Sequence, residues 1–178
     1  MKLTVRYATA DDAGILGRIH ALAWQATYQG IVPDERLSRM TCENRQQYFT
    51  KVLAEEQAKD AAGEPITERN AIVFVDEQPA GLICLGQCRD EDKDRTVGEI
   101  WGIYLLQEYW HRGIGGYLMN WGIAELKMQN YQWACLWVLK DNLQARRFYE
   151  KMGFRHDDSQ KEIVLGTVLT EYRYVLKI

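Results

Sequence analysis

Apolar residues recur along parts of the chain with the period of two that is typical of strands. Leu3–Tyr7 alternates near the start, and Val168–Leu176 alternates near the end. Trp133–Leu139 is almost continuously apolar, which is typical of a central strand covered on both faces. Further strands are expected over Ala71–Val75, Ala80–Cys88, Glu99–Leu105 and a segment that begins at Phe154. A tight turn at Asp76–Pro79 joins the first two of these further strands.

Other apolar residues follow the period of a helix. The first such helix begins after Asp11 or Asp12, because either side chain can cap it. A break follows at Gly30 and Pro33. The apolar positions expected on the buried face of this first helix are Ile15, Ile19, Leu22 and Ala23. Further helices are expected over Asp34–Met40, Glu43–Ala58, Tyr117–Gln129 and Asn142–Met152.

The order of these elements predicts the fold class. Helices interrupt the strands early and late, whereas the middle strands follow one another directly. This order indicates a mixed α/β (α+β) fold, in which helices flank a mixed sheet of about seven strands. The length of 178 residues suits one domain, expected over 1–178. The polar segment Lys59–Asn70 is expected to be a loop. The charged run Arg89–Arg95 is expected to be a solvated hairpin loop.

Composition excludes several classes of protein. Apolar residues make up 47% of the chain and charged residues 26%, which is typical of a globular protein. The net charge is −3 and the Lys and Arg residues are scattered, so a nucleic-acid partner is not expected. No apolar run is long enough to cross a bilayer, and the N-terminus lacks the apolar core of a signal peptide. We therefore expect a soluble cytoplasmic protein with no membrane partner.

The cysteines show no metal-binding or disulfide spacing. None of them forms a CxxC pair, and the histidines do not cluster with them, so we expect free thiols and no metal. The residues concerned are Cys42, Cys84, Cys88, Cys135, His20, His111 and His156.

The most informative segment is a strand followed by a glycine-rich turn that opens a helix. Gly113, Gly115 and Gly116 lie in this turn, after the strand Glu99–Leu105. The first amides of a helix have no intrahelical partner and carry partial positive charge, so such a turn can hold a phosphate or pyrophosphate. Arg112 could add a charged donor. A tight strand-to-helix connection without a ligand is the alternative.

Two known nucleotide motifs do not fit this turn. A P-loop is excluded because no Gly-Lys-Ser/Thr follows, and the spacing differs from that of a Rossmann fingerprint. Gly102 inside the preceding strand indicates either a bulge that frees backbone groups for a ligand or close packing against an aromatic residue such as Trp101.

A second segment joins the strand Trp133–Leu139 to the helix that follows it. Asn142 or Asp141 can cap that helix. Tyr149 lies seven residues after Asn142, so these two residues share one helical face. That face could present an amide and a phenol to one ligand. A plain cap and a boundary tyrosine remain the alternative.

Together these segments resemble the GNAT superfamily of acetyl-CoA-dependent N-acetyltransferases. The family's Q/R-x-x-G-x-G/A motif falls on Trp110–Gly115, with Trp110 replacing the usual Gln or Arg. The opening Arg6–Ala13 is also similar to that of the family. The later Asn-x-x-Ala-x-x-x-Tyr-x-x-x-Gly-Phe pattern is matched by Asn142, Ala145, Tyr149, Gly153 and Phe154.

The resemblance implies an N-acetyltransferase that moves the acetyl group of acetyl-CoA to a primary amine of a small molecule or protein, by direct attack in a ternary complex. Acetyl-CoA is then a co-substrate, and no metal is needed. The cofactor-binding residues implied are Ile103, Tyr104, Leu105, His111, Arg112, Gly113, Ile114, Gly115, Gly116, Asn142 and Tyr149.

The resemblance also implies roles in catalysis. Tyr149 is the expected acid for the thiolate, and the N–H of Leu105 is the expected oxyanion donor. Glu99 is the candidate base, although an acidic residue at a strand start is often only exposed. Trp24 and Tyr28 share a helical face and are expected beside the acceptor, with core packing as the alternative.

Two other functions remain open at this point. One is a non-catalytic CoA-binding or sensing module on the same fold, and the other is a partner-binding protein that takes no CoA. The acceptor itself is also open among polyamines, aminoglycosides, amino acids and protein N-termini. Assembly into a homodimer is left open as well.

Overall fold

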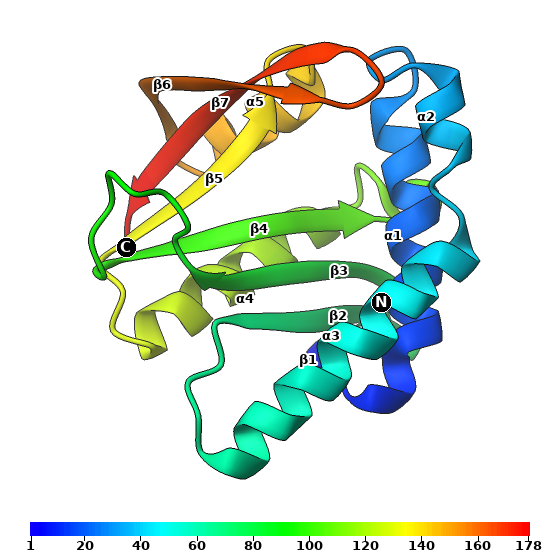
Figure 1. Cartoon of the computed structure of the whole chain (residues 1–178), viewed down its shortest axis with the longest axis vertical. Helices are drawn as coiled ribbons and strands as arrows, with labels where there is room; N and C mark the ends of the chain where they lie inside the picture. The colour runs from blue at the N-terminus through cyan, green and yellow to red at the C-terminus, as the bar shows by residue number, and fades with distance from the viewer.

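The computed structural model describes every residue, Met1–Ile178. Its centre is a seven-stranded mixed sheet with the order β1-β2-β3-β4-β5-β7-β6, and helices lie on both faces (Figure 1). This confirms the predicted fold class. The strands are β1 Leu3–Tyr7, β2 Glu68–Val75, β3 Gln78–Gln87, β4 Val97–Leu105, β5 Trp133–Leu139, β6 Arg155–Val164 and β7 Val168–Lys177.

The helices occur where the periodicity predicts them. The α-helices are α1 Ala13–Tyr28, α2 Asp34–Ser38, α3 Cys42–Ala62, α4 Ile114–Met128 and α5 Leu143–Lys151, and two 3-10 helices are η1 Ala10–Asp12 and η2 Gln107–Tyr109. No helix combines the length and apolarity that crossing a bilayer requires.

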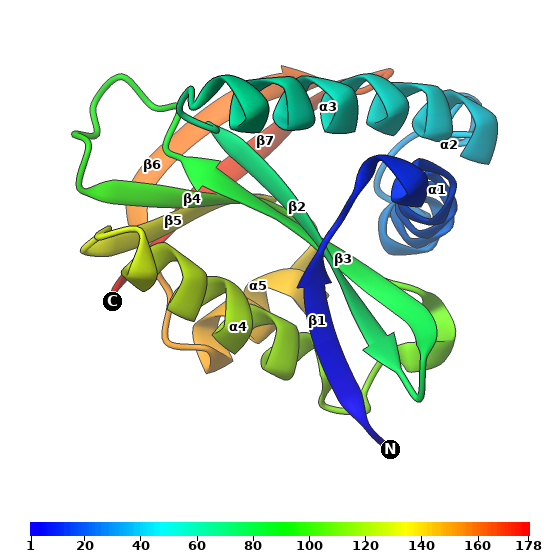
Figure 2. The same ribbon diagram turned by 90° about the horizontal axis from the view of Figure 1, so that it is seen from below.

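Helices cover both faces of the sheet (Figure 2), and a separate cluster of buried side chains lies on each face. We call the face covered by α1 and α3 the front, where Leu16, Ile19 and Phe49 pack on Ile72 and Leu82. We call the face covered by α4 and α5 the back, where a cluster of 17 buried residues includes alternate residues of β5. β5 is therefore a central strand, as its apolar run predicts.

Several local predictions were wrong. The buried side of α1 carries Leu16 in addition to Ile19, whereas Leu22 is 39% exposed. The expected loop Lys59–Asn70 shrinks to five residues, because α3 continues to Ala62 and β2 begins at Glu68. The turn between β2 and β3 has only two residues, Asp76 and Glu77. Both have positive φ values (46° and 70°), which fits a hairpin turn.

The charged run Arg89–Arg95 is not simply solvated, which corrects a further expectation. Arg89 binds the buried Glu99 through its backbone N–H and its guanidinium. The guanidinium of Arg173 in β7 donates to Asp90 at 3.1 Å and to Asp92 at 2.6 Å. Arg173 belongs to the sheet and is only 4% exposed. Its contacts with Asp90 and Asp92 therefore hold the loop against the front face of the sheet.

β4 and β5 separate along their length (Figure 1). Their parallel pairing runs only from Val97↔Trp133 to Glu99↔Cys135. A bulge in β4 lies just beyond, because Cys84 pairs with Gly102 while Leu85 pairs with Ile100. Of the two alternatives for Gly102, the bulge is therefore observed. A Cβ at Gly102 would also lie 3.0 Å from the ring of Tyr104, so the glycine packs closely against an aromatic residue as well.

Candidate active site

A cleft of about 550 Å³ lies where β4 and β5 separate. Its walls come from the end of β4, the glycine turn, α5 and the C-terminal part of α1. Predicted site residues that line it are Ile103, Leu105, His111, Gly113, Gly115, Gly116, Asn142 and Tyr149. Ile103 and Tyr149, which are 46 positions apart in the chain, therefore line one cavity, as the resemblance implies but no local pattern could require.

The glycine turn presents free backbone amides to this cleft. Gly113 precedes α4 with φ of +81°, a conformation that suits glycine. The first helical bond is donated by Tyr117 to the carbonyl of Gly113, so the amides of Ile114, Gly115 and Gly116 precede the hydrogen-bonded ladder. A Cβ at Gly115 would lie 3.5 Å from Leu105 and Phe148, which both line the cleft. Bulk at Gly115 is therefore directed into the cavity.

Trp110, which replaces the usual Gln or Arg, has a structural partner. Its indole Nε1 donates to the carbonyl oxygen of Leu105 at 2.9 Å, and its side chain also lines the cleft. This bond connects the end of β4 to the start of the glycine turn. The departure from the motif therefore leaves the turn anchored to the strand.

The end of β4 directs backbone donors toward the separation. The N–H of Leu106 donates to Ala80 in β3 at 2.9 Å. Because successive residues of a strand direct their N–H groups to opposite edges, the N–H groups of Leu105 and Ile103 face the edge next to β5. Pairing with β5 has already ended at Glu99. These N–H groups are available to an oxygen atom in the cleft.

α5 supplies Asn142 and Tyr149. The side-chain oxygen of Asn142 caps the helix by accepting from the N–H of Ala145 at 3.1 Å, which leaves its NH₂ group for other partners. Tyr149 is 9% exposed and packs beside Phe148 and Phe154. Burial raises the pKa of the Tyr149 phenol, so the hydroxyl is protonated at neutral pH and can serve as a proton donor.

A polar group of aromatic and acidic side chains lies on the front side of the separation. The hydroxyls of Tyr28 and Tyr104 are 3.4 Å apart. Glu171 in β7 pairs with Leu139 of β5, and its charge acts on both of these hydroxyls. Burial raises the pKa of Glu171, although Lys161, 3.8 Å away, opposes the shift.

His20 lies next to this group but has different chemistry. Its ring packs against Tyr104 with centroids 4.9 Å apart. Burial lowers the pKa of His20 to about 3, so the imidazole is neutral at physiological pH. Glu171 is therefore the better proton acceptor on this side of the sheet.

The structure does not bring Glu99 to the cleft, which corrects the choice of base. Glu99 is 1% exposed, and both of its oxygens are bound by Arg89. It lies six residues before Leu105 along β4, which is roughly 20 Å of strand. An ion-paired carboxylate at that distance cannot reach an amine beside the cleft.

Five other predicted residues do not present their side chains to the cleft: Tyr28, Tyr104, Arg112, Ile114 and Trp24. Tyr104 points to the front, against Tyr28 and His20. Arg112 is exposed and donates to the carbonyl of Glu108 at 3.4 Å. Ile114 is fully buried in the back core, and Trp24 is buried beside Val32 and Leu37. Arg112 and Ile114 can still contribute their backbone amides.

Sequence reasoning missed several residues of the site. Arg147 and Lys151 line the cleft from α5, and Thr27 lines it from α1. The four-residue spacing of Arg147 and Lys151 on the helix of Tyr149 was a readable signal for a cationic wall. Glu171 had no such signal, because its position depends on the pairing of β7 with β5.

Known proteins resemble this chain in sequence and structure. Residues 24–154 match the family model described as acetyltransferase (GNAT) family. An uncharacterized N-acetyltransferase of Archaeoglobus fulgidus is 37% identical over 158 residues, which are 88% of this chain and 96% of that protein. A spermidine N(1)-acetyltransferase of Thermoplasma acidophilum is 25% identical over 159 residues, 89% of this chain and 92% of that protein.

A solved structure shares the fold over the full length. The PaiA N-acetyltransferase of Thermoplasma acidophilum, in complex with coenzyme A, matches with a TM-score of 0.77 and 21% sequence identity, covering 100% of both chains.

Proposed function

The chain belongs to the acetyltransferase (GNAT) family, and we propose that it transfers the acetyl group of acetyl-CoA to a primary amine by direct attack in a ternary complex. The observation that carries the proposal is the shared cleft at the separation of β4 and β5. Its lining combines free backbone amides, cationic side chains and the protonated phenol of Tyr149. These are the groups that a pyrophosphate and a departing thiolate require.

We propose that acetyl-CoA enters this cleft from the back of the sheet. Its pyrophosphate would bind the backbone amides from Arg112 to Gly116, where the helix start favours negative charge. Arg147 and Lys151 would add positive charge from α5. The relative in complex with coenzyme A supports the choice of ligand. The thioester would then lie near the end of β4.

The acetyl transfer would proceed by attack of the neutral amine on the thioester carbonyl carbon. The carbonyl oxygen becomes an oxyanion, which the N–H of Leu105 is directed to stabilise. Cleavage of the C–S bond then releases CoA thiolate, the nitrogen loses one further proton to water, and the neutral acetylated amine remains. Tyr149 would protonate the thiolate, because its buried phenol holds its proton at neutral pH.

We infer that Glu171 receives the proton that the acceptor amine must lose. An alkyl ammonium with a pKa of about 10.4 is mostly protonated at neutral pH and cannot attack. Glu171 is half-buried on the front side, where its raised pKa makes it a stronger base than an exposed carboxylate. Burial and the negative charge of Glu171 both raise the pKa of the Tyr28 hydroxyl. The proton could therefore move to Glu171 directly or through water.

The acceptor is proposed to be a cationic alkylamine. Glu171 offers negative charge, and the rings of Tyr28 and Tyr104 offer faces that attract cations. The name of the Thermoplasma relative, a spermidine acetyltransferase, favours the same class. Acetyl transfer from acetyl-CoA to spermidine, diamines, aminoglycosides, amino acids and peptide N-termini should be highest for the alkyl polyamines. Tight CoA binding without transfer to any amine would favour the non-catalytic CoA module instead.

Replacing Gly115 with valine should weaken acetyl-CoA binding on the order of 10- to 100-fold, or about 1.4–2.8 kcal/mol. The added carbon atoms would project between Leu105 and Phe148 into the cavity. Gly14→Val is the matched control, because Gly14 is also the second residue of its helix and is exposed. Isothermal titration with acetyl-CoA measures the effect. Wild-type affinity in a folded Gly115→Val protein would exclude the pyrophosphate assignment.

Removing the charge of Arg147 should lower acetyl-CoA affinity more than removing the charge of Arg112. Arg147→Gln should lower acetyl-CoA affinity about three- to tenfold and reduce its salt dependence, because a cation facing the phosphates is lost. Arg112→Gln should change both quantities less, since that side chain turns toward Glu108. Titrations at two salt concentrations distinguish the variants. A larger loss for Arg112→Gln would restore the role expected from the motif.

A further inference from the structure

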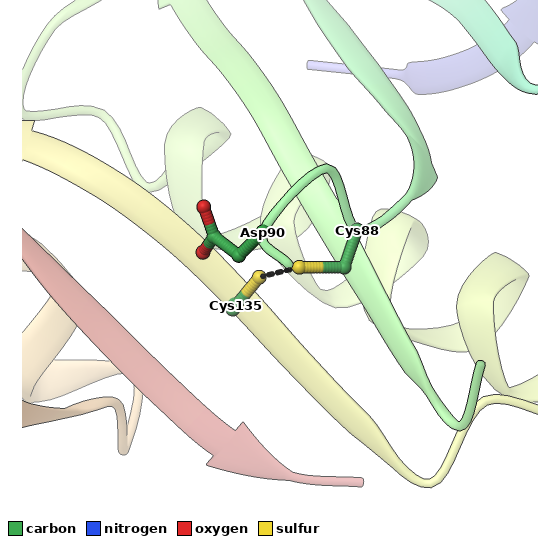
Figure 3. Close-up of side chains that lie close together, drawn as sticks. All are labelled: Cys88, Asp90 and Cys135. Carbon is green, nitrogen blue, oxygen red and sulfur yellow. Dashed lines mark hydrogen bonds between the residues drawn. The ribbon is translucent and has the colours of Figure 1, made fainter. Parts of the chain in front are cut away.

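Two cysteines and an aspartate meet on the front face of the sheet, outside the cleft. Cys88 follows β3, Cys135 lies in β5, and Asp90 belongs to the charged loop (Figure 3). The two sulfur atoms are 3.3 Å apart. One ligand atom from each of the three residues lies within 4.8 Å of the others. The cluster therefore gathers three possible ligand atoms around one point.

The spacing of these atoms suits a tetrahedral metal ion. Zinc–sulfur bonds of 2.3 Å at a tetrahedral angle place two sulfur atoms about 3.8 Å apart. The sulfur atoms of Cys88 and Cys135 need to move apart by only about half an ångström to reach that separation. Two thiolates and a carboxylate favour Zn²⁺ over Mg²⁺ or Ca²⁺, which prefer oxygen ligands throughout.

The carboxylate of Asp90 is held in place by residues behind it. The indole Nε1 of Trp137 donates to both of its oxygens, at 3.2 and 3.0 Å. Arg173 donates to one oxygen at 3.1 Å. Metal-binding carboxylates are commonly oriented by such outer hydrogen bonds. Oδ1 of Asp90 accepts only the bond from Trp137, so this oxygen keeps a lone pair for a metal ion.

The surrounding charges also accommodate a cation. The nearest guanidinium groups are already paired, Arg89 with Glu99 and Arg173 with several carboxylates. The surrounding carboxylates balance the surrounding basic groups: Asp92, Glu99 and Asp157 against Arg89, Lys93 and Arg173. Cys88 is only half-buried, so an ion could enter from solvent.

We propose that Cys88, Asp90 and Cys135 form a Zn²⁺ site with one coordination position left to water. Binding would release the two thiol protons to solvent and form two zinc–sulfur bonds and one zinc–oxygen bond. The ion would link the charged loop to β5 at Cys135, the last residue of β5 that pairs with β4. This proposal replaces the expectation, drawn from cysteine spacing, that the thiols have no metal role.

The test is metal binding by the full chain, reduced with a phosphine and freed of metal by a chelator. Titration with Zn²⁺ should give one ion per chain, and titration with Co²⁺ should give the absorption bands of thiolate in tetrahedral coordination. Cys88→Ser should bind Zn²⁺ about 100-fold more weakly, and Trp137→Phe about tenfold more weakly, because the latter removes a donor to Asp90. Zn²⁺ should raise the Tm of the wild type and not that of Cys88→Ser.

Cys42→Ser is the matched control, because Cys42 is a free, half-buried cysteine outside the cluster. It should bind Zn²⁺ as the wild type does. The proposal is overturned if the reduced wild type and Cys88→Ser bind Zn²⁺ equally, or if Cys42→Ser loses binding as well. It is also overturned if reduced protein binds no metal while air oxidation joins Cys88 to Cys135 in a disulfide.

Discussion

Replacing Tyr149 with phenylalanine is expected to lower turnover by about 10²–10⁴-fold while leaving acetyl-CoA affinity nearly unchanged. General acid catalysis contributes a factor of this size, and the substitution removes only the hydroxyl that would protonate the thiolate. The ring remains, so its packing against Phe148 and Phe154 should persist. Phosphate binding should also persist, because the glycine turn is untouched. The measurement is turnover with a saturating amine, under conditions where acetyl transfer limits the rate.

A control and a second readout make this prediction specific. Tyr117→Phe removes the hydroxyl of an exposed tyrosine on α4 and should leave turnover unchanged. Acyl donors whose thiol leaving group has a lower pKa need less protonation, so they should narrow the gap between Tyr149→Phe and the wild type. Undiminished turnover in Tyr149→Phe would rule out the acid role. Parallel loss of CoA affinity and activity would instead make Tyr149 a structural residue.

Replacing Glu171 with glutamine is expected to lower kcat/KM about 10²–10³-fold at neutral pH, because the ammonium of the acceptor loses its proton acceptor. The sign of the pH dependence follows from burial. The pKa of Glu171 is raised, and only its ionised form is a base, so wild-type kcat/KM should fall as pH drops through that raised pKa. The variant should lack this step. A pH profile of kcat/KM with a polyamine measures both effects.

Raising the pH should narrow the difference between Glu171→Gln and the wild type. As pH approaches the amine pKa of about 10.4, more acceptor is already neutral and a base is less needed. Glu162→Gln is the matched control, because Glu162 is an exposed glutamate next to Lys161 on β6. A deficit for Glu171→Gln that stays constant at every pH would indicate a role in binding the acceptor and not in proton transfer.

The buried polar groups show why some predictions from the sequence were wrong. Glu99 lies in β4, the strand that leads to the glycine turn. Its carboxylate is nevertheless paired with the guanidinium of Arg89, far from the cleft. Glu171 has no motif at all, yet the register of β7 against β5 places it on the front face, where burial and the charge of Glu171 raise the pKa of Tyr28 and Tyr104. Side-chain partners of this kind depend on pairing between distant segments, which local periodicity does not encode.

The sequence by itself determined the elements whose signals are local. Alternation gave β1 and the continuous apolar run gave β5 with the bounds seen in the structure, because side-chain period and burial follow directly from strand geometry. The glycine turn and the pair Asn142 and Tyr149 were readable for the same reason, since a helix start and a helical face need only adjacent residues. The separation of β4 and β5 was different. Only three residue pairs join these strands before a bulge in β4, and the separation that follows makes one cleft of these segments. The cluster of Cys88, Asp90 and Cys135 depends instead on the contacts of the charged loop with Glu99, Trp137 and Arg173. Contacts between distant strands decide such gaps, because the hydrogen bonds that a strand leaves unmade depend on which neighbour it meets and where their pairing ends.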